Sequence, residues 1–414
     1  MDMMSVRLRR QAFVWCAFLL LLSEPGKGQE PPRDSLSAAF IHQLRVEARP
    51  QYVFPTNPFV KGENERKKPL EWGGGADLKY SFKFRPNTFA DRVYGGVYQG
   101  VGAGYCTLGN RKELGDLYTL YLFQGARIAA FSRRLSLNYE WNFGISGGWQ
   151  PYHQADNPFN GAVGSRLNAY INAGIWLNWA VSRCFDLMLG GDLTHFSNGN
   201  TKFPNAGINL AGLKLGVAYN FNRERQDIMK PAYRPFVPPF PRHFSYDLVL
   251  FGSWRRKGVA FEGKQYASPE AYPVAGLNFA AMYNAGYKFR FGLSLDGVYD
   301  GSANVYTEDA IVAYGDAPSP QEFFKPGVHR QLALGVSGRT EYVMPYFTIG
   351  VGIGSNVIAR GDMRGLYQVL ALKVKMSRNA FLHIGYNLQD FKAPNYLMLG
   401  MGCRFHNKYP RIRH

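Results

Sequence analysis

The sequence predicts an all-β fold, a transmembrane antiparallel β-barrel of fourteen or sixteen strands that follows a cleaved signal peptide. Two observations lead to this prediction. After residue 75, segments with alternating apolar and polar residues recur, and many exceed the roughly 9–11 residues that a tilted strand needs to cross a bilayer. Clusters of Gly, Asn, Asp and Pro separate these segments, as turns require. Outer-membrane barrels made of one chain have even strand numbers.

Residues 163–179 show the alternation most clearly. Ile171 and Ile175 share one face with other apolar residues, whereas Asn168 and Asn172 lie on the opposite face. A soluble β-sandwich also alternates, but its strands are usually shorter and its polar face meets bulk water. The length of these segments and the aromatic residues at their ends favour a membrane barrel, with the apolar face toward lipid and the polar face toward the lumen.

Applied along the whole chain, the same test gives fifteen segments after residue 75, and an upstream strand near 43–53 would bring the total to sixteen. They are expected near 43–53, 78–86, 95–107, 116–130, 133–149, 163–180, 183–197, 207–221, 244–256, 272–289, 290–299, 328–341, 344–355, 364–376, 380–389 and 395–405. The Pro-rich segment 230–242 is interpreted as a long connection within one barrel, because a closed barrel needs all its strands to remove exposed edges. No internal repeat is evident.

The N-terminal stretch has the plan of a secretory signal peptide. A basic start is followed by an apolar core from Ala12 to Leu22 and then by small and helix-breaking residues, with cleavage expected near Gly28. The apolar core is short for a membrane-spanning helix. The predicted organisation is a signal peptide at 1–28, an N-terminal segment with a first strand at 29–75, the barrel at 76–406 and a C-terminal tail at 407–414.

Composition limits the partners. The formal net charge is +18, and on an exported chain a basic excess suits an anionic lipid surface. Nucleic acid is not expected as a partner, because no basic tract is interleaved with aromatic residues. No Cys or His spacing indicates a metal site, and no cofactor motif is present. The expected surroundings are therefore a membrane, and a homodimer is compatible with the sequence.

One polar stretch stands out, "HFSNGNTKFPNAGIN" at residues 195–209. Alternation in the strand 183–197 places His195 and Ser197 on the apolar side with Leu193. In the next strand, Asn209 shares its side with Leu213. If the two strands form a hairpin, three polar side chains meet on a surface that faces lipid. The alternative interpretation is an interfacial His followed by a turn, since turns are rich in Asn and Gly.

The three residue types fit a serine hydrolase. Ser is a weak nucleophile until a base accepts its proton, and His acts as that base when a third group fixes its tautomer. We assign Ser197 as nucleophile, His195 as base and Asn209 as the orienting group. Asn198, which follows the nucleophile, is the candidate oxyanion donor through its backbone or side-chain amide. The acids Asp192 and Glu140 fall on the lumen side and are rejected as the third member.

The same stretch resembles the catalytic segment of the outer-membrane lipid A 3-O-deacylase family, which has His-x-Ser-Asn followed by Lys-x-Pro-Asn-x-Gly-Ile. The resemblance is strongest over 160–221. It implies a triad of Ser, His and Glu, but here Asn209 stands where the Glu is expected. The His-x-Ser-Asn-Gly run also resembles outer-membrane phospholipase A, whose third member is an Asn. Lys202 and Asn205 stand where the calcium ligands of that enzyme would be wanted, so no metal is expected.

The resemblance implies an acyl-ester hydrolase in the bacterial outer membrane that removes an ester-linked acyl chain from lipid A by a Ser-His-Asn mechanism. Its partner would be the lipopolysaccharide of the outer leaflet. Two alternatives remain open at this point. One is phospholipase A action on glycerophospholipid, and the other is a non-catalytic porin or transport barrel that uses the polar lumen.

Overall fold

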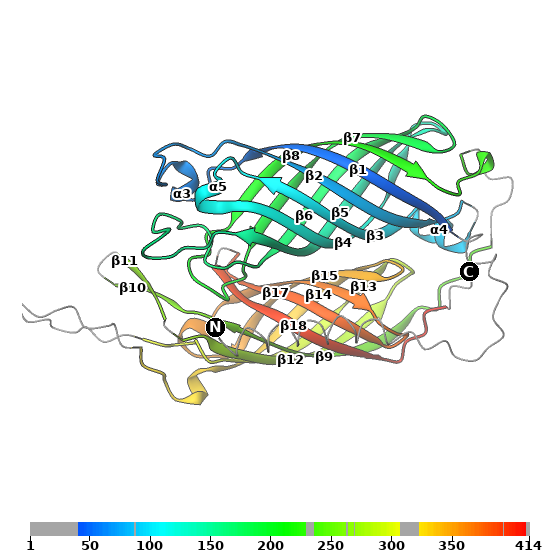
Figure 1. Cartoon of the computed structure of the whole chain (residues 1–414). Helices are drawn as coiled ribbons and strands as arrows, with labels where there is room; N and C mark the ends of the chain where they lie inside the picture. The colour runs from blue at the N-terminus through cyan, green and yellow to red at the C-terminus, as the bar shows by residue number, and fades with distance from the viewer. Residues whose placement is uncertain are drawn as a thin grey trace, which may run out of the picture. The chain divides into compact units, whose positions relative to one another are not determined.

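A computed structural model provides the coordinates. It describes residues 40–86, 88–228, 236–261, 264–268, 270–306, 323–391 and 393–410. The predicted signal peptide lies outside these residues. The described chain contains sixteen barrel strands, which is one of the two expected totals, but they close into two separate barrels of eight strands each (Figure 1).

The first barrel is an antiparallel meander in which each strand pairs with its neighbour in sequence and β1 pairs with β8 to close the ring. Its strands are β1 (Phe40–Val53), β2 (Trp72–Phe84), β3 (Tyr98–Thr107), β4 (Gly115–Ala130), β5 (Leu135–Trp149), β6 (Asn168–Ala180), β7 (Phe185–Ser197) and β8 (Ile208–Asn220).

The second barrel repeats this connectivity and closes through pairing of β9 with β18. Its strands are β9 (His243–Arg255), β12 (Tyr272–Asn284), β13 (Phe289–Asp300), β14 (Leu332–Val343), β15 (Phe347–Ile358), β16 (Leu366–Lys375), β17 (Ala380–Gln389) and β18 (Ala393–Phe405). A two-stranded hairpin of β10 (Gly258–Phe261) and β11 (Lys264–Ala267) is inserted after β9.

The expectation of one large barrel is therefore wrong, and the chain carries a structural repeat that the sequence did not reveal. The Pro-rich segment 230–242, of which the structure describes 236–242, lies in the sequence between β8 of the first barrel and β9 of the second rather than within one barrel. The physical reason is that alternation reports only which face of a strand meets lipid. It says nothing about which pair of strands closes a ring, and closure of eight strands removes the edges as completely as closure of sixteen.

Short helices decorate the loops. They are α3 (Pro58–Lys61), α4 (Phe89–Tyr94) and α5 (Arg111–Leu114), with 3-10 turns η1 (Arg225–Asp227), η2 (Val328–Arg330) and η3 (Gly361–Met363). Within the described ranges, no helix has the length and apolarity that a membrane-spanning helix needs.

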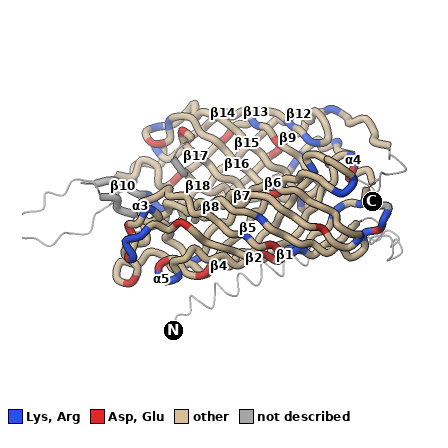
Figure 2. Tube along the Cα trace, turned by 90° about the horizontal axis from the view of Figure 1, so that it is seen from above, with Lys and Arg blue, Asp and Glu red and all other residues tan. Residues whose placement is uncertain are grey.

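The facing predicted from alternation is confirmed in β6. Ile171 and Ile175 are exposed on the outer surface, whereas Asn172 and Trp176 are almost completely buried inside the barrel. Figure 2 shows Lys, Arg, Asp and Glu near the ends of the strands and also at positions along the strand bodies. An apolar outer surface along the strand bodies is what a bilayer requires.

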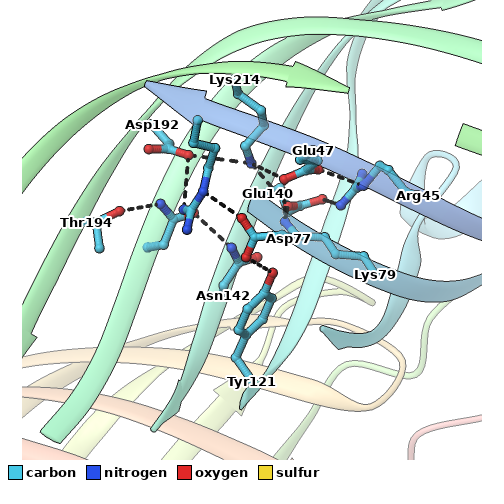
Figure 3. A network of polar contacts seen from close by, with 12 residues as sticks. Arg45, Glu47, Asp77, Lys79, Tyr121, Glu140, Asn142, Asp192, Thr194 and Lys214 are labelled. Atoms are coloured by element: carbon cyan, nitrogen blue, oxygen red, sulfur yellow. Dashed lines mark hydrogen bonds and ion pairs between the residues drawn. The ribbon is translucent and has the colours of Figure 1, made fainter. Parts of the chain in front are cut away.

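Charged side chains fill the lumen of the first barrel (Figure 3). Glu140 on β5 lies 2.6 Å from Lys79 Nζ and 3.3 Å from Lys214 Nζ, and it also pairs with Arg45 on β1. Arg45 is 2.7 Å from Glu47 in turn. Since β1 and β5 lie on opposite sides of an eight-stranded ring, the network spans the lumen. Its charged members are Arg45, Arg49, Lys79, Lys214, Glu47, Asp77, Glu140 and Asp192, four of each sign.

The lumen of the second barrel holds its own ion pairs. Asp247 lies 2.8 Å from Lys373 and 2.7 Å from Arg404, and Glu341 lies 2.7 Å from Arg290. All but Arg404 are less than 9% exposed. Burying charges is tolerated only when they are paired, and here both barrels pair them across the interior.

The two-barrel architecture predicts that a chain truncated after Ile228 still forms a closed barrel. All eight strands of the first ring and their closing β1–β8 pairing are retained, so no edge is left open. We expect the refolded truncation to migrate on an unheated gel as a compact, heat-modifiable species. A chain truncated inside the ring, after Ala180, is the control and should show no such species. Aggregation of both truncations would contradict the independent closure of the first barrel.

The lumen network predicts a large effect of Glu140→Gln. The substitution keeps the shape but leaves Arg45, Lys79 and Lys214 with less compensating charge in a buried site, at a cost of about 3–5 kcal/mol in the free energy of unfolding. Denaturant unfolding of the barrel in detergent micelles measures it. Glu63→Gln at an exposed loop position is the matched control and should change stability by less than about 0.5 kcal/mol. Equal stability of the two variants would contradict a structural role for the network.

Candidate active site

The register of the β7–β8 hairpin brings two of the predicted residues face to face. His195 on β7 and Asn209 on β8 are direct cross-strand partners, and Ser197 ends β7 two residues beyond His195. Residues that are directly opposite in an antiparallel pair have Cβ atoms about 4.5–5.5 Å apart. The ten-residue loop 198–207 reverses the chain direction and so places Asn209 beside His195, although the two residues are 14 positions apart in the sequence.

All three side chains lie on the outer surface of the barrel. Their neighbours in sequence, Thr194 and Phe196, point inward and are 3% and 1% exposed. His195, Ser197 and Asn209 are half-buried on the opposite face, in line with the exposed Leu193. The predicted facing is therefore confirmed, and the site opens toward lipid rather than into the lumen.

A short hydrogen bond joins His195 to Asn209. The distance between His195 Nδ1 and Asn209 Oδ1 is 2.7 Å. Because an amide oxygen only accepts, this contact requires a proton on Nδ1. In the neutral imidazole, the other ring nitrogen, Nε2, then carries a lone pair and can accept a proton from a nucleophile.

Ser197 lies close to His195 because of its place on the strand. It shares the outward face with His195, and two residues along a strand correspond to about 6–7 Å between Cα atoms. Across the described chain, no hydrogen bond joins the Ser197 hydroxyl to the His195 ring. Catalytic hydrogen bonds are often longer before substrate binds.

The backbone amide and the side-chain amide of Asn198 differ in their hydrogen bonding. Its backbone N–H donates to Asn205 Oδ1 at 2.9 Å, so the backbone amide is already occupied. Its side chain is 5% exposed, and its Nδ2 has no hydrogen-bond partner within the described residues. Of the two donors that the sequence offered for an oxyanion, only the side-chain amide lacks a partner among the described residues, and it is buried.

The rejected acids lie where alternation placed them. Glu140 and Asp192 are 1% and 5% exposed in the lumen, where Glu140 pairs with Lys79 and Asp192 lies 3.8 Å from Lys214 (Figure 3). The barrel wall separates both from His195, so neither can act as its partner.

Sequence reasoning missed a set of contacts from the loop after β1. Phe54 N donates to the backbone oxygen of Asn209 at 2.9 Å, and Asn209 Nδ2 donates to Thr56 Oγ1 at 3.2 Å. Asn57 Nδ2 donates to Gly207 O at 2.8 Å. These residues are about 150 positions from the hairpin. They meet it only because β1 closes the ring against β8, and no local pattern could have indicated this.

Gly207 packs directly against the catalytic candidate. A Cβ added to it would lie 3.1 Å from His195 Cε1, and its φ is +69°. Both features require glycine at this position. The Gly of the "PNAG" run at 204–207 therefore has a spatial reason, which is to let the backbone approach the imidazole.

The second barrel has no equivalent pair in its described part. Its last hairpin, β17–β18, occupies the place of β7–β8, and the stretch "GYNLQDF" at 385–391 resembles "GGDLTHF" at 190–196. Asp390 stands where His195 would be, and it accepts a hydrogen bond from Leu366 N at 3.2 Å in a turn. The candidate active site is therefore confined to the first barrel.

The fold and the outward-facing polar group define the class, a β-barrel protein of the bacterial outer membrane. The family models identify the group within that class. Residues 69–218 match the model of lipid A 3-O-deacylase (PagL), and residues 244–407 match that of the acyloxyacyl hydrolase C-terminal domain. Each model covers most of one barrel, so the first barrel is similar to the lipid A 3-O-deacylase (PagL) and the second to the acyloxyacyl hydrolase C-terminal domain.

The comparison with solved structures gives matches of low sequence identity and low TM-score. The outer-membrane enzyme PagL is 18% identical, with a TM-score of 0.28, and the match covers 42% of this chain and 97% of that one. Neisserial surface protein A is 11% identical, with a TM-score of 0.29, over 44% of this chain and 97% of that one. No curated protein sequence matches the chain.

Proposed function

We propose that this protein is an outer-membrane acyl-ester hydrolase that removes an ester-linked acyl chain from lipid A. The observation that carries the proposal is the 2.7 Å contact between His195 and Asn209, on the lipid-facing surface beside Ser197. It lies inside the barrel that matches the lipid A 3-O-deacylase model.

The mechanism follows from the roles of the three residues. His195 Nε2 accepts the hydroxyl proton as Ser197 Oγ attacks the ester carbonyl, which gives a tetrahedral intermediate. The C–O bond to the sugar then breaks, and His195 returns the proton to the leaving hydroxyl. Water attacks the acyl-serine in the same way and releases a free fatty acid. Asn198 Nδ2 is the donor proposed for the oxyanion.

The position of the site suits a lipid substrate in the outer leaflet. In outer-membrane barrels, turns on the periplasmic side are short and outer loops are long. Ser197 lies at the end that carries the connections 54–71, 108–114, 150–167 and 198–207. At the opposite end the connections 131–134 and 181–184 are short, and 85–97, which contains α4, is longer. An acyl chain of lipid A would reach the dyad laterally, without leaving the bilayer.

Asn209 in place of the family's Glu changes the electrostatics of the triad. An amide oxygen holds the Nδ1 proton and so the ring orientation, but it lends no negative charge to the imidazolium that forms during attack. Asn at this position favours phospholipase A as the second candidate. A solute channel is disfavoured in the first barrel, because the ion-pair network packs its lumen with nearly unexposed side chains.

The first experiment compares the native chain with Ser197→Ala and His195→Ala in cells that make hexa-acylated lipid A. We expect the native chain to remove one ester-linked acyl chain and each variant to lose activity by at least about 10³-fold, as triad members do. Mass spectrometry of extracted lipid A measures this, and the heat-modifiable gel shift controls for folding.

Each other outcome identifies a different function. Fatty acid released from glycerophospholipid, with lipid A unchanged, would replace the proposal with phospholipase action. Unchanged lipids together with altered solute uptake would favour a transport barrel. Full lipid A deacylation by Ser197→Ala would overturn the serine mechanism.

A second experiment tests the third member of the triad. Asn209→Leu removes the acceptor and should lower kcat by at least about tenfold, because a hydrogen bond to the imidazolium that forms during attack contributes about 1.5–3 kcal/mol. Asn209→Glu restores the family's residue and a negative charge, so we expect similar or greater activity. Steady-state hydrolysis of purified lipid A in mixed micelles measures both. If Asn209→Leu were fully active, another group would have to orient His195.

A further inference from the structure

A carboxamide poses a problem that a carboxylate does not. Its oxygen and nitrogen occupy two similar positions, and a half-turn of the group exchanges them. With Asn209 Nδ2 toward His195, Nδ1 would have to accept, and the proton would move to Nε2. Nε2 could then no longer take the proton of Ser197. A triad with Asn therefore needs a contact that distinguishes the two ends of the amide.

We propose that Thr56 is a positioning residue that supplies this contact; the inference rests on the proposed function. Thr56 Oγ1 lies 3.2 Å from Asn209 Nδ2, on the side of the amide away from His195. It accepts the amide hydrogen and holds Oδ1 against His195 Nδ1, where the distance is 2.7 Å. Thr56 does not touch the reacting atoms, so it acts through Asn209.

The hydrogen bonds have one consistent direction. Thr56 Oγ1 is 3.5 Å from the carbonyl oxygen of Phe54, which can only accept. Across this long contact the Thr56 hydroxyl can donate to Phe54 O, which also accepts from Thr56 N at 2.8 Å, and its lone pairs are then left for Asn209 Nδ2. Asn209 Oδ1 then accepts from His195, and His195 Nε2 is left as the acceptor toward Ser197.

The loop that carries Thr56 is fixed on both sides of Asn209. Phe54 N donates to Asn209 O at 2.9 Å, and Asn57 Nδ2 donates to Gly207 O at 2.8 Å. Asn57 also caps α3, since its Oδ1 accepts from Val60 N at 3.0 Å. Thr56 itself is exposed, so its side chain fills no core space. These anchors hold its hydroxyl opposite the amide, and the residue has no packing role that would explain the placement.

The test uses Thr56→Val, which keeps the branched shape but has no hydroxyl, and Thr56→Ser, which keeps the hydroxyl. In the full chain we expect Thr56→Val to lower kcat by about 3–10-fold, the range for one hydrogen bond, with KM unchanged. Thr56→Ser should retain at least about half of the native kcat. Hydrolysis of purified lipid A in mixed micelles gives both constants, and the gel shift confirms folding.

A double substitution separates orientation from structure. A carboxylate presents an oxygen at either end, so in the Asn209→Asp background Thr56→Val should change kcat by less than about twofold. Equal losses in the two backgrounds would overturn the proposal, because they would mean that Thr56 only supports the loop. Native kcat in Thr56→Val would also overturn it.

The experiments distinguish failure of the positioning role of Thr56 from failure of the proposed serine mechanism. Loss of hydrolysis in Ser197→Ala with an indifferent Thr56→Val would remove only the positioning role. Hydrolysis that persists in Ser197→Ala would remove the serine mechanism itself, and the role of Thr56 with it.

Discussion

The pairing of β1 with β8 is the constraint on which the rest of the first barrel depends. It closes the ring, and it also positions residues both in the lumen and next to the candidate active site on the outer surface. On the lumen side, β1 contributes Arg45, Glu47 and Arg49 to the ion-pair network. At its outer end, β1 leads directly into the loop that contacts Asn209 and Gly207. The same strand therefore sets both the packed lumen and the support of the candidate active site.

The inner face of the barrel wall carries paired charges, whereas the candidate site on the outer face is uncharged. Inside, eight charges of both signs compensate one another in a space from which water is largely excluded, and this pairing is what makes their burial tolerable. Outside, the site is built without any formal charge, from a hydroxyl, an imidazole and a carboxamide. A neutral site is cheaper to hold against lipid than an aspartate or glutamate would be. That consideration gives a physical reason why Asn209 can stand in the third position, provided that the amide is held in one orientation.

The two barrels share a topology but not a site. The second barrel has its own closing pair and its own lumen ion pairs around Asp247 and Glu341. Asp390, directly after its seventh strand, stands at the position that corresponds to His195. It accepts a hydrogen bond from a backbone N–H in a turn and, among the described residues, has no amide partner like Asn209. Its fold is thus maintained by the same physical means, whereas the chemistry that we propose uses residues of the first barrel. This agrees with the match of the two barrels to two different family models.

By itself, the sequence determined the class of fold, the approximate strands and the facing of side chains within them, because a period of two residues is a local property that lipid on one side enforces. Strand ends were less certain, since the strand expected from residue 163 begins at Asn168. It therefore placed His195, Ser197 and Asn209 outside and Glu140 and Asp192 inside. The tertiary structure alone decided that sixteen strands form two rings, since closure depends on pairing between distant strands. It alone also brought Thr56 and Asn57 to the hairpin, because a contact across about 150 residues leaves no trace in local periodicity.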